Sequence, residues 1–205
     1  MVFYSRTLHS ALRTLLWVMV SVFLFSVSVS ADAAAPEEGN GIFPSFGDGP
    51  VEVRIYASYF CPPCRAMEPE LEPILEELVE TGRIRLTFVD VPVGNFKPYI
   101  YGFLFALNND KSMENAARVR RILFDVAGKR GGKQEIQEAF EREGIRYTPF
   151  DPEAVFLRFN QLIREDAVRV TPSAAIHKKG EGKTIKGGRD ILAALEALKS
   201  EENGS

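Results

Sequence analysis

The sequence predicts an α/β fold in which a block of helices separates a β-α-β unit from a β-β-α unit. Three observations lead to this prediction. Strand and helix patterns alternate over residues 51–91, helical patterns fill residues 98–166, and strand character returns before a final helix. The chain has 205 residues, contains no internal repeat, and is long enough for one domain with a full hydrophobic core.

The first unit is expected to contain a strand, a helix and a second strand. Residues 51–57 have β character, and residues 61–80 carry apolar side chains at helical spacing up to Gly82, which suits a helix C-terminus. Pro69 lies inside this helix and is expected to kink it. Residues 83–91 alternate at first and then become continuously apolar, as a buried strand does.

The helical insertion is predicted to contain four helices. Ser112 is a good N-cap, and Asp151-Pro152 pairs a capping residue with a proline suited to the first helical position. The four helices are expected over residues 98–108, 112–127, 133–143 and 151–165.

The last unit is expected to be a β-hairpin followed by a helix. Residues 173–177 and 183–186 have strand character, and the glycine-containing stretch 178–182 between them predicts a turn. Asp190 is then placed to cap a final helix over residues 191–199.

The chain has two cysteines, Cys61 and Cys64, which form a C-x-x-C pair at the junction of the first strand and the first helix. This pattern is typical of a redox-active dithiol. The free N–H groups and positive dipole at a helix N-terminus lower the pKa of a thiol. Cys61 is therefore the expected nucleophile, and Cys64 lies close enough to resolve a mixed disulfide.

Other uses of the two cysteines are weaker. A zinc site needs about four ligands, and the only histidines are His9 and His177. A disulfide closing so short a loop would constrain little of the unfolded chain. The alternative from a different class is a binding or assembly factor that holds Cu(I) through the two thiolates, although no methionine or histidine cluster accompanies them. We expect neither a metal nor an organic cofactor.

Residues 1–33 resemble a secretory signal peptide. Arg6 and Arg13 are the only charges before Asp32, the stretch between is apolar or small, and Ala31-Asp32-Ala33 offers a small-x-small cleavage site. Export to a bacterial periplasm is the expected outcome, where disulfides persist. An uncleaved N-terminal membrane anchor is the alternative. Residues 34–50 are expected to be a flexible arm, and residues 200–205 a C-terminal tail.

The charge pattern argues against nucleic-acid binding, because the net charge at pH 7 is only −3. Two further groups of residues, one aromatic and one basic, are expected to have structural and not functional roles. The aromatic run of Tyr99, Tyr101, Phe103 and Phe105 is more typical of a core than of a ligand site. A basic cluster is expected to form a solvated face; its members are Arg118, Arg120, Arg121, Lys129, Arg130 and Lys133.

Over residues 51–199 the chain resembles the thioredoxin superfamily, and within it the DsbA-like exported thiol-disulfide oxidoreductases. The resemblance rests on Cys61-Pro62-Pro63-Cys64 at the strand-to-helix junction, on Pro69, on the helical insertion of residues 98–166, and on Thr171-Pro172 before the hairpin. It implies a thioredoxin-like fold with the insertion between its βαβ and ββα halves.

The resemblance also implies roles for individual residues. Cys61 would attack, Cys64 would be the buried resolving cysteine, and Pro172 would be a cis-proline. The backbone before that proline would pair with an extended substrate chain, so that Thr171 faces the substrate cysteine. Three residues would adjoin the active site: Phe60, Pro62 and Pro63.

The implied activity is thiol-disulfide exchange on exported proteins that contain cysteine. A membrane redox partner would reset the pair, either a quinone-linked oxidase or a thiol-transferring reductase, and the direction of exchange stays open. The chain is expected to be a monomer.

Two features depart from the family pattern. Many relatives carry an acid six residues before the first cysteine, where this chain has Ile55, so proton exchange with Cys64 must rely on another group or on water. Pro62 and Pro63 replace the histidine of the strongest oxidants and remove two N–H donors. Both changes at the dipeptide are expected to make the Cys61 thiol less acidic and the disulfide less oxidising.

Overall fold

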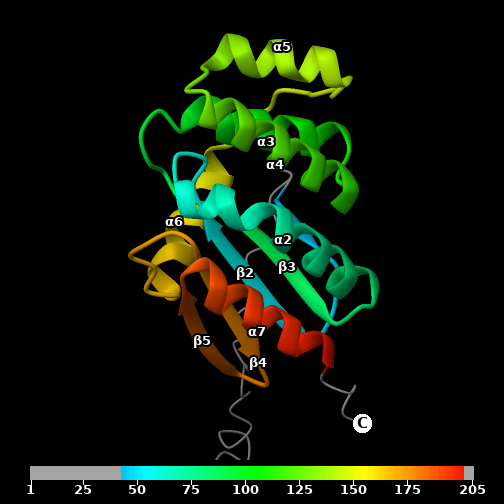
Figure 1. Cartoon of the computed structure of the whole chain (residues 1–205), viewed down its shortest axis with the longest axis vertical. Coiled ribbons are helices and arrows are strands. Elements are labelled where there is room, and N and C mark those ends of the chain that lie inside the picture. Colours follow the sequence, from blue (N-terminus) through cyan, green and yellow to red (C-terminus); the bar gives the residue numbers. More distant parts are fainter. Residues whose placement is uncertain (1–42, 201–205) are drawn as a thin grey trace, which may run out of the picture. The chain divides into compact units, whose positions relative to one another are not determined.

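A computed structural model describes residues 43–200, which form a five-stranded sheet and six helices (Figure 1). The strands are β1 (Ser45–Phe46), β2 (Val51–Ala57), β3 (Ile84–Asp90), β4 (Ser173–Lys178) and β5 (Glu181–Lys186). The helices are α2 (Pro62–Glu80), α3 (Lys97–Asn109), α4 (Met113–Gly128), α5 (Lys133–Glu143), α6 (Glu153–Glu165) and α7 (Gly188–Ser200). The order confirms the predicted β-α-β unit, helical insertion and β-β-α unit.

The sheet has the strand order β1-β3-β2-β4-β5. Strands β2 and β3 are parallel and in register from Val51 beside Ile84 to Ala57 beside Asp90. The other pairs are antiparallel, and β4 joins β2 along its second edge. The carboxyl ends of β2 and β3 therefore finish side by side, immediately before the chain turns into the C-x-x-C motif.

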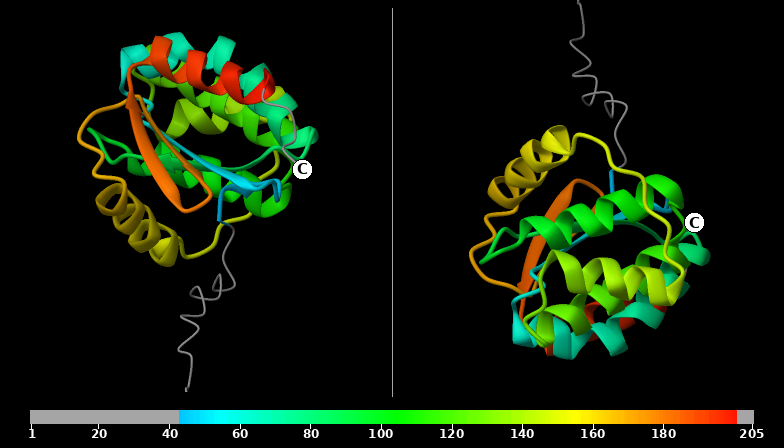
Figure 2. Two further views of the ribbon diagram at one scale, coloured as in Figure 1. Left: turned by 90° about the horizontal axis from the view of Figure 1, so that it is seen from below. Right: turned by 90° about the horizontal axis from the view of Figure 1, so that it is seen from above.

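Helices cover both faces of the sheet. Helices α2 and α7 lie together on one face, whereas α6 lies on the other (Figure 2). The hydroxyl of Tyr56 on β2 lies 3.2 Å from the carbonyl oxygen of Leu162 on α6, so α6 packs on that second face. Helices α3, α4 and α5 gather at one end of the sheet, with α5 outermost (Figure 1).

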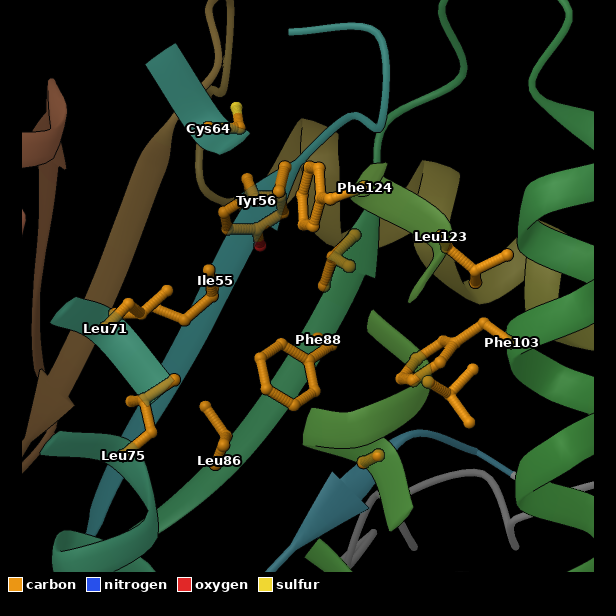
Figure 3. Close-up of a cluster of buried hydrophobic side chains, with 14 of the residues drawn as sticks. Ile55, Tyr56, Cys64, Leu71, Leu75, Leu86, Phe88, Phe103, Leu123 and Phe124 are labelled. Carbon is orange, nitrogen blue, oxygen red and sulfur yellow. The ribbon is translucent and has the colours of Figure 1, made fainter. Parts of the chain in front are cut away.

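The core on the α2 face is built from alternate residues of the two parallel strands (Figure 3). Ile55, Leu86 and Phe88 point toward α2, where Leu71 and Leu75 meet them, and all five are at most 2% exposed. The helical period of α2 and the two-residue period of the strands thus direct their apolar side chains to one layer.

The strand β1 was not expected from the sequence, which predicted a flexible arm over residues 34–50. Ser45 and Phe46 pair antiparallel with Thr87 and Leu86. Phe46 is 6% exposed, and its ring lies 5.9 Å from that of Phe88 in an edge-on arrangement. Pairing with β3 and the burial of this ring hold the short segment at the sheet edge, and the ring of the preceding Phe43 lies 5.9 Å from that of Phe159.

Several terminal predictions lie outside the described residues. These are the signal peptide over residues 1–33, most of the arm, and the tail beyond Ser200. Within residues 43–200, none of the helices combines the length and the apolar character needed to cross a bilayer.

Element boundaries differ from the predicted ones by a few residues. The hairpin turn is confined to Lys179 and Gly180, which both have positive φ, so the strands extend further than expected. Helix α6 begins at Glu153, with Pro152 at the N-cap position instead of Asp151. The Asp151 carboxylate still accepts from the N–H of Glu153 at 3.1 Å. Ser112 caps α4 as predicted, accepting from the N–H of Asn115.

The packing of α2 on the sheet generates a prediction about stability. Replacing the fully buried Leu71 by alanine (Leu71→Ala) is expected to lower the free energy of unfolding by about 2 to 5 kcal/mol, since it leaves a cavity in the core. Urea denaturation followed by circular dichroism measures the change. Leu157→Ala is the matched control: Leu157 is 64% exposed, and its loss is expected to cost less than about 0.5 kcal/mol. Equal losses in the two variants would contradict this packing.

Candidate active site

The two cysteines form a disulfide at the start of α2. Cys61 is the N-cap residue and is half-buried, whereas Cys64 in the first turn is fully buried. Pro62 and Pro63 occupy the first helical positions and have no N–H to donate, so the amide that reaches the sulfur of Cys61 is that of Cys64, at 3.2 Å. One sulfur is thus accessible, and its partner faces the core.

The loop before β4 brings a distant part of the chain against this pair. The Thr171-Pro172 peptide bond is cis, as the resemblance implied. The carbonyl oxygen of Thr171 lies 3.4 Å from the sulfur of Cys61. Pro172 is buried and Thr171 is half-buried. The pairing of β4 with β2, which sets Ser173 beside Tyr56, holds this loop in place.

Apolar side chains surround the accessible cysteine. Phe60 is half-buried and meets the ring of Tyr99 edge-on at 5.0 Å. The loop after β3 lies against Phe60 at Gly94, and the neighbouring Val93 is 46% exposed. Val170, just before the cis-proline, is 53% exposed. The surface near Cys61 is therefore suited to contact with an apolar stretch of polypeptide.

Beneath the cysteines lies a cluster of buried polar groups, which we call the buried acid cluster: Tyr59, Glu68, Asp90 and Arg120, each at most 5% exposed. The guanidinium of Arg120 binds both carboxylate oxygens of Glu68, at 2.6 and 3.0 Å. It also lies 4.0 Å from the carboxylate of Asp90 and 4.1 Å above the centre of the Phe88 ring. A bidentate contact between arginine and a carboxylate, as Arg120 makes with Glu68, is among the strongest ion pairs in proteins.

The elements place this cluster close to the redox pair. Asp90 ends β3 and lies beside Ala57, the last residue of β2. The N–H of Val91, the next residue, donates to the carbonyl of Ala57 at 2.7 Å, which keeps the two chains together at this point. Glu68 lies one helical turn beyond Cys64 on α2. Tyr59 stands in the short link between β2 and the motif, and its ring packs on Phe124 of α4 at 5.0 Å.

The charges in the cluster do not balance. Arg120 is one cation against two carboxylates, and its close hydrogen bonds go to Glu68. Both carboxylate oxygens of Asp90 and the hydroxyl of Tyr59 are buried without a hydrogen-bond partner. Burial raises the pKa of Asp90 to about 7, although the nearby Arg120 opposes the shift. Burial, together with the charge of Asp90, also raises the pKa of Tyr59 well above its usual value.

The buried acid cluster was not predicted from the sequence. Arg120 was expected on a solvated face with its basic neighbours, and that expectation is wrong, because Arg120 is 1% exposed and faces the core from α4. Two signals were available in the sequence. Asp90 is an acid at the end of an otherwise buried strand, and Glu68 follows Cys64 at the spacing that shares one helix face.

A second polar network lies around Asp166, just after α6. Tyr56 and Arg54 donate to its carboxylate, the latter at 3.1 and 3.2 Å, and the ring of His177 lies 3.0 Å from it. Arg54 also contacts Glu52 at 2.7 Å. Glu52, Arg54 and Tyr56 alternate with Val53 and Ile55 along β2 and so face away from α2.

The aromatic run on α3 divides between core and surface. Tyr99 and Phe103 are fully buried, whereas Tyr101 and Phe105 are half-buried. Tyr101 contributes to a cavity of about 340 Å³ between α3 and α6. The cavity is lined by Asp90, Pro92, Phe96, Lys97, Tyr101, Asp151, Pro152, Glu153, Phe156, Phe159 and Asn160.

Metal ligands do not gather anywhere in residues 43–200, since no three His, Cys, Asp or Glu side chains are arranged to hold an ion there.

Comparison with known proteins identifies similar folds. The family model Thioredoxin_4, described as thioredoxin, matches residues 47–180. A periplasmic thioredoxin-like protein from Salmonella enterica serovar Typhimurium is similar in structure, with a TM-score of 0.56, 22% identity, and coverage of 77% of this chain and 91% of that one. No curated protein matches the chain in sequence.

Two structures of disulfide-exchange proteins are also similar. Oxidised BdbD from Bacillus subtilis has a TM-score of 0.53 and 18% identity over 77% of this chain and 94% of its own. DsbA from Chlamydia trachomatis has a TM-score of 0.51 and 17% identity over 78% of this chain and 94% of its own. These likenesses confirm the predicted thioredoxin-like fold with its helical insertion.

The unequal exposure of the two sulfurs generates a prediction. Brief treatment of the reduced protein with iodoacetamide is expected to alkylate Cys61 and spare Cys64, because Cys64 is 0% exposed. Peptide mass spectrometry identifies the labelled residue. Labelling in urea, where both cysteines must react, is the control. Preferential labelling of Cys64 in the folded protein would refute the assignment of Cys61 as the attacking residue.

The burial of Asp90 generates a prediction about pH. The folded protein holds the Asp90 proton up to about pH 7, whereas an unperturbed carboxyl releases it near 3.8. Raising the pH between these values therefore favours the unfolded state. Compared with Asp90→Asn, the wild-type protein is expected to lose stability over this range, measured by urea denaturation at each pH. Asp125→Asn, which removes an exposed carboxylate on α4, is expected to leave the wild-type pH dependence in place. Parallel profiles for the wild type and Asp90→Asn would contradict the assignment.

Proposed function

Since this chain belongs to the thioredoxin family, we propose that it catalyses thiol-disulfide exchange on exported proteins that contain cysteine. The observation that carries the proposal is the Cys61–Cys64 disulfide at the start of α2, with one sulfur half-exposed and the other fully buried. That asymmetry suits a pair in which one cysteine meets the substrate and the second resolves the intermediate.

The exchange proceeds through a mixed disulfide. In the reducing direction, the Cys61 thiolate attacks a substrate disulfide, an S–S bond forms between them, and the first substrate thiolate leaves. Cys64 then attacks the sulfur of Cys61 as a thiolate, which forms the intramolecular disulfide and releases the second substrate thiolate. The oxidising direction is the reverse, with a substrate thiolate attacking Cys61 and Cys64 leaving. Neither direction requires a metal or an organic cofactor.

Substrate binding is assigned to the main chain beside the cis-proline and to the apolar surface around it. The carbonyl of Thr171 already lies 3.4 Å from the sulfur of Cys61, so a chain placed along residues 170–171 would have its cysteine next to the pair. Phe60, Val93 and Val170 offer apolar contacts on either side. Such contacts use no fixed sequence pattern, which suits an enzyme with many unfolded or partly folded substrates.

The direction of exchange depends on the partner that resets the pair and on how well the Cys61 thiolate is stabilised. A quinone-linked membrane oxidase would make the protein a disulfide donor, and a thiol-transferring membrane reductase would make it a disulfide remover. Pro62 and Pro63 leave the Cys64 amide as the helix N–H bonded to the sulfur of Cys61. Weak stabilisation of the thiolate favours the reducing side of the family.

The proposed location is the periplasm, reached through the signal peptide of residues 1–33. Two observations support it. A disulfide between the two cysteines persists in an oxidising compartment such as the periplasm, where cellular thiols do not continually reduce it. The similar protein from Salmonella enterica is itself described as periplasmic.

Trapping of the mixed disulfide tests the proposal. A Cys64→Ala variant, which cannot resolve the intermediate, is expected to form a covalent adduct with scrambled ribonuclease that survives non-reducing electrophoresis and disappears with dithiothreitol. Cys61→Ala is the matched control and is expected to form none, because its remaining thiol is buried. The proposal fails if the Cys64→Ala variant forms no adduct, or if Cys61→Ala forms adducts equally well.

A further inference from the structure

The resolving step poses a problem that the redox pair alone does not solve. Cys64 attacks as a thiolate, so the thiol must first lose its proton, yet Cys64 is 0% exposed. Bulk water therefore cannot accept that proton directly, and burial in apolar surroundings opposes ionisation of the thiol. Strand β2 supplies no proton acceptor on this face, because it has Ile55 at the position where many relatives carry an acid.

Three acids of the described chain are buried: Glu68, Asp90 and Asp166. Asp166 lies in the network on the α6 side and already accepts hydrogen bonds from Tyr56 and Arg54. Glu68 is held by Arg120 through both of its oxygens. Asp90 alone of the three has no hydrogen-bond partner for either oxygen.

The register of the sheet puts Asp90 at the right end of the molecule. It lies beside Ala57, two residues further along the sheet than the Ile55–Phe88 pair, and so nearer to the start of α2. Figure 3 shows Cys64 at this same end of the core, beyond Ile55. Asp90 shares the α2 face with Phe88, since side chains two apart on a strand point the same way.

We propose that Asp90 is the proton acceptor for Cys64 in the resolving step, directly or through one water molecule. This inference rests on the proposed thiol-disulfide exchange and deepens it. As the S–H bond of Cys64 breaks, its proton moves to Asp90, and the electron pair left on sulfur forms the bond to Cys61 while the substrate thiolate leaves. In the oxidising direction, protonated Asp90 returns the proton to the departing Cys64 thiolate. Electrons pass only between the protein and substrate sulfurs.

The surrounding charges are compatible with this exchange. From α4, Arg120 favours the carboxylate, whereas Glu68 from α2 disfavours it. The hydroxyl of Tyr59, which is also buried and unpartnered, faces the carboxyl from the link before Cys61. With burial, these groups hold the pKa of Asp90 near 7, where a group can both accept and return a proton.

Asp90 also adjoins a cavity, although both of its carboxylate oxygens are buried. It is among the residues that line the cavity of about 340 Å³ between α3 and α6. The cavity is edged by charged and exposed residues, namely Lys97, Asp151 and Glu153.

Reaction of the reduced protein with dithionitrobenzoate, followed at 412 nm by stopped flow, separates the two chemical steps. Attack by Cys61 releases one thionitrobenzoate, and resolution by Cys64 releases the second. In Asp90→Asn the first release is expected to be unchanged, and the second to slow roughly 100-fold at neutral pH, the scale of general base catalysis. The inflection of the second rate near pH 7 is expected to vanish. Asp125→Asn, an exposed carboxylate on α4, is the control and is expected to alter neither step.

The outcomes separate this inference from the proposed function. If the wild-type protein never releases the second thionitrobenzoate, the proposed exchange fails and the role of Asp90 fails with it. If the wild type completes both steps and Asp90→Asn resolves at the same rate across the pH range, the role of Asp90 alone is overturned. A slowed second step without change in the pH profile also overturns it, since a purely structural effect would do the same.

A measurement on the wild-type protein covers the case in which Asp90→Asn does not fold. The carbon-13 carboxyl signal of Asp90 is titrated by NMR in the oxidised and in the reduced protein. Because the acceptor and the Cys64 thiol would be coupled, the apparent pKa of Asp90 is expected to differ between the two states. Identical titrations would overturn the inference.

Discussion

The ion pair between Arg120 and Glu68 connects the helical insertion to the helix that carries the redox pair. Arg120 comes from α4 and Glu68 from α2, and both side chains are almost completely buried. Burying two charges is costly, and the attraction repays that cost only when the hydrogen bonds are well formed. Here the guanidinium meets both carboxylate oxygens and stacks on Phe88, so its position is tightly fixed. Removing one partner of such a pair typically costs about 3 to 5 kcal/mol.

The ion pair between Arg120 and Glu68 affects the charge of the nearby Asp90 carboxyl. Because the hydrogen bonds of Arg120 go to Glu68, its guanidinium lies 4.0 Å from the Asp90 carboxylate and neutralises that charge only in part. A fully satisfied Asp90 would be a fixed anion with a low pKa, and an apolar residue in its place would leave the core without a titratable group. The arrangement instead leaves a carboxyl whose charge can change near neutral pH, at the end of the core where Cys64 lies.

The main features of the fold could be predicted because they follow from local patterns. The structure contains the helix predicted from the apolar period of residues 61–80, the predicted strands, and the C-x-x-C motif at a strand-to-helix junction. The cis Thr171-Pro172 bond agrees with the family resemblance. The strand of Ser45–Phe46 was missed because two residues are too few to show a repeating pattern, and the strand depends on its pairing with β3 and on a buried ring. The buried acid cluster was missed for a similar reason. Whether Arg120 faces water or Glu68 is decided by the packing of α4 on α2, which no spacing within α4 reveals.

The most direct test of the account is the reduction potential of the Cys61–Cys64 pair, measured by equilibration with glutathione. An exchange-active pair is expected to equilibrate reversibly at a potential between about −120 mV, the strong-oxidant end of the family, and about −270 mV, the thioredoxin end. The absence of a histidine and the two prolines at the helix start place the expected value toward the second limit. A potential below about −300 mV, the range of structural disulfides in secreted proteins, would contradict the account.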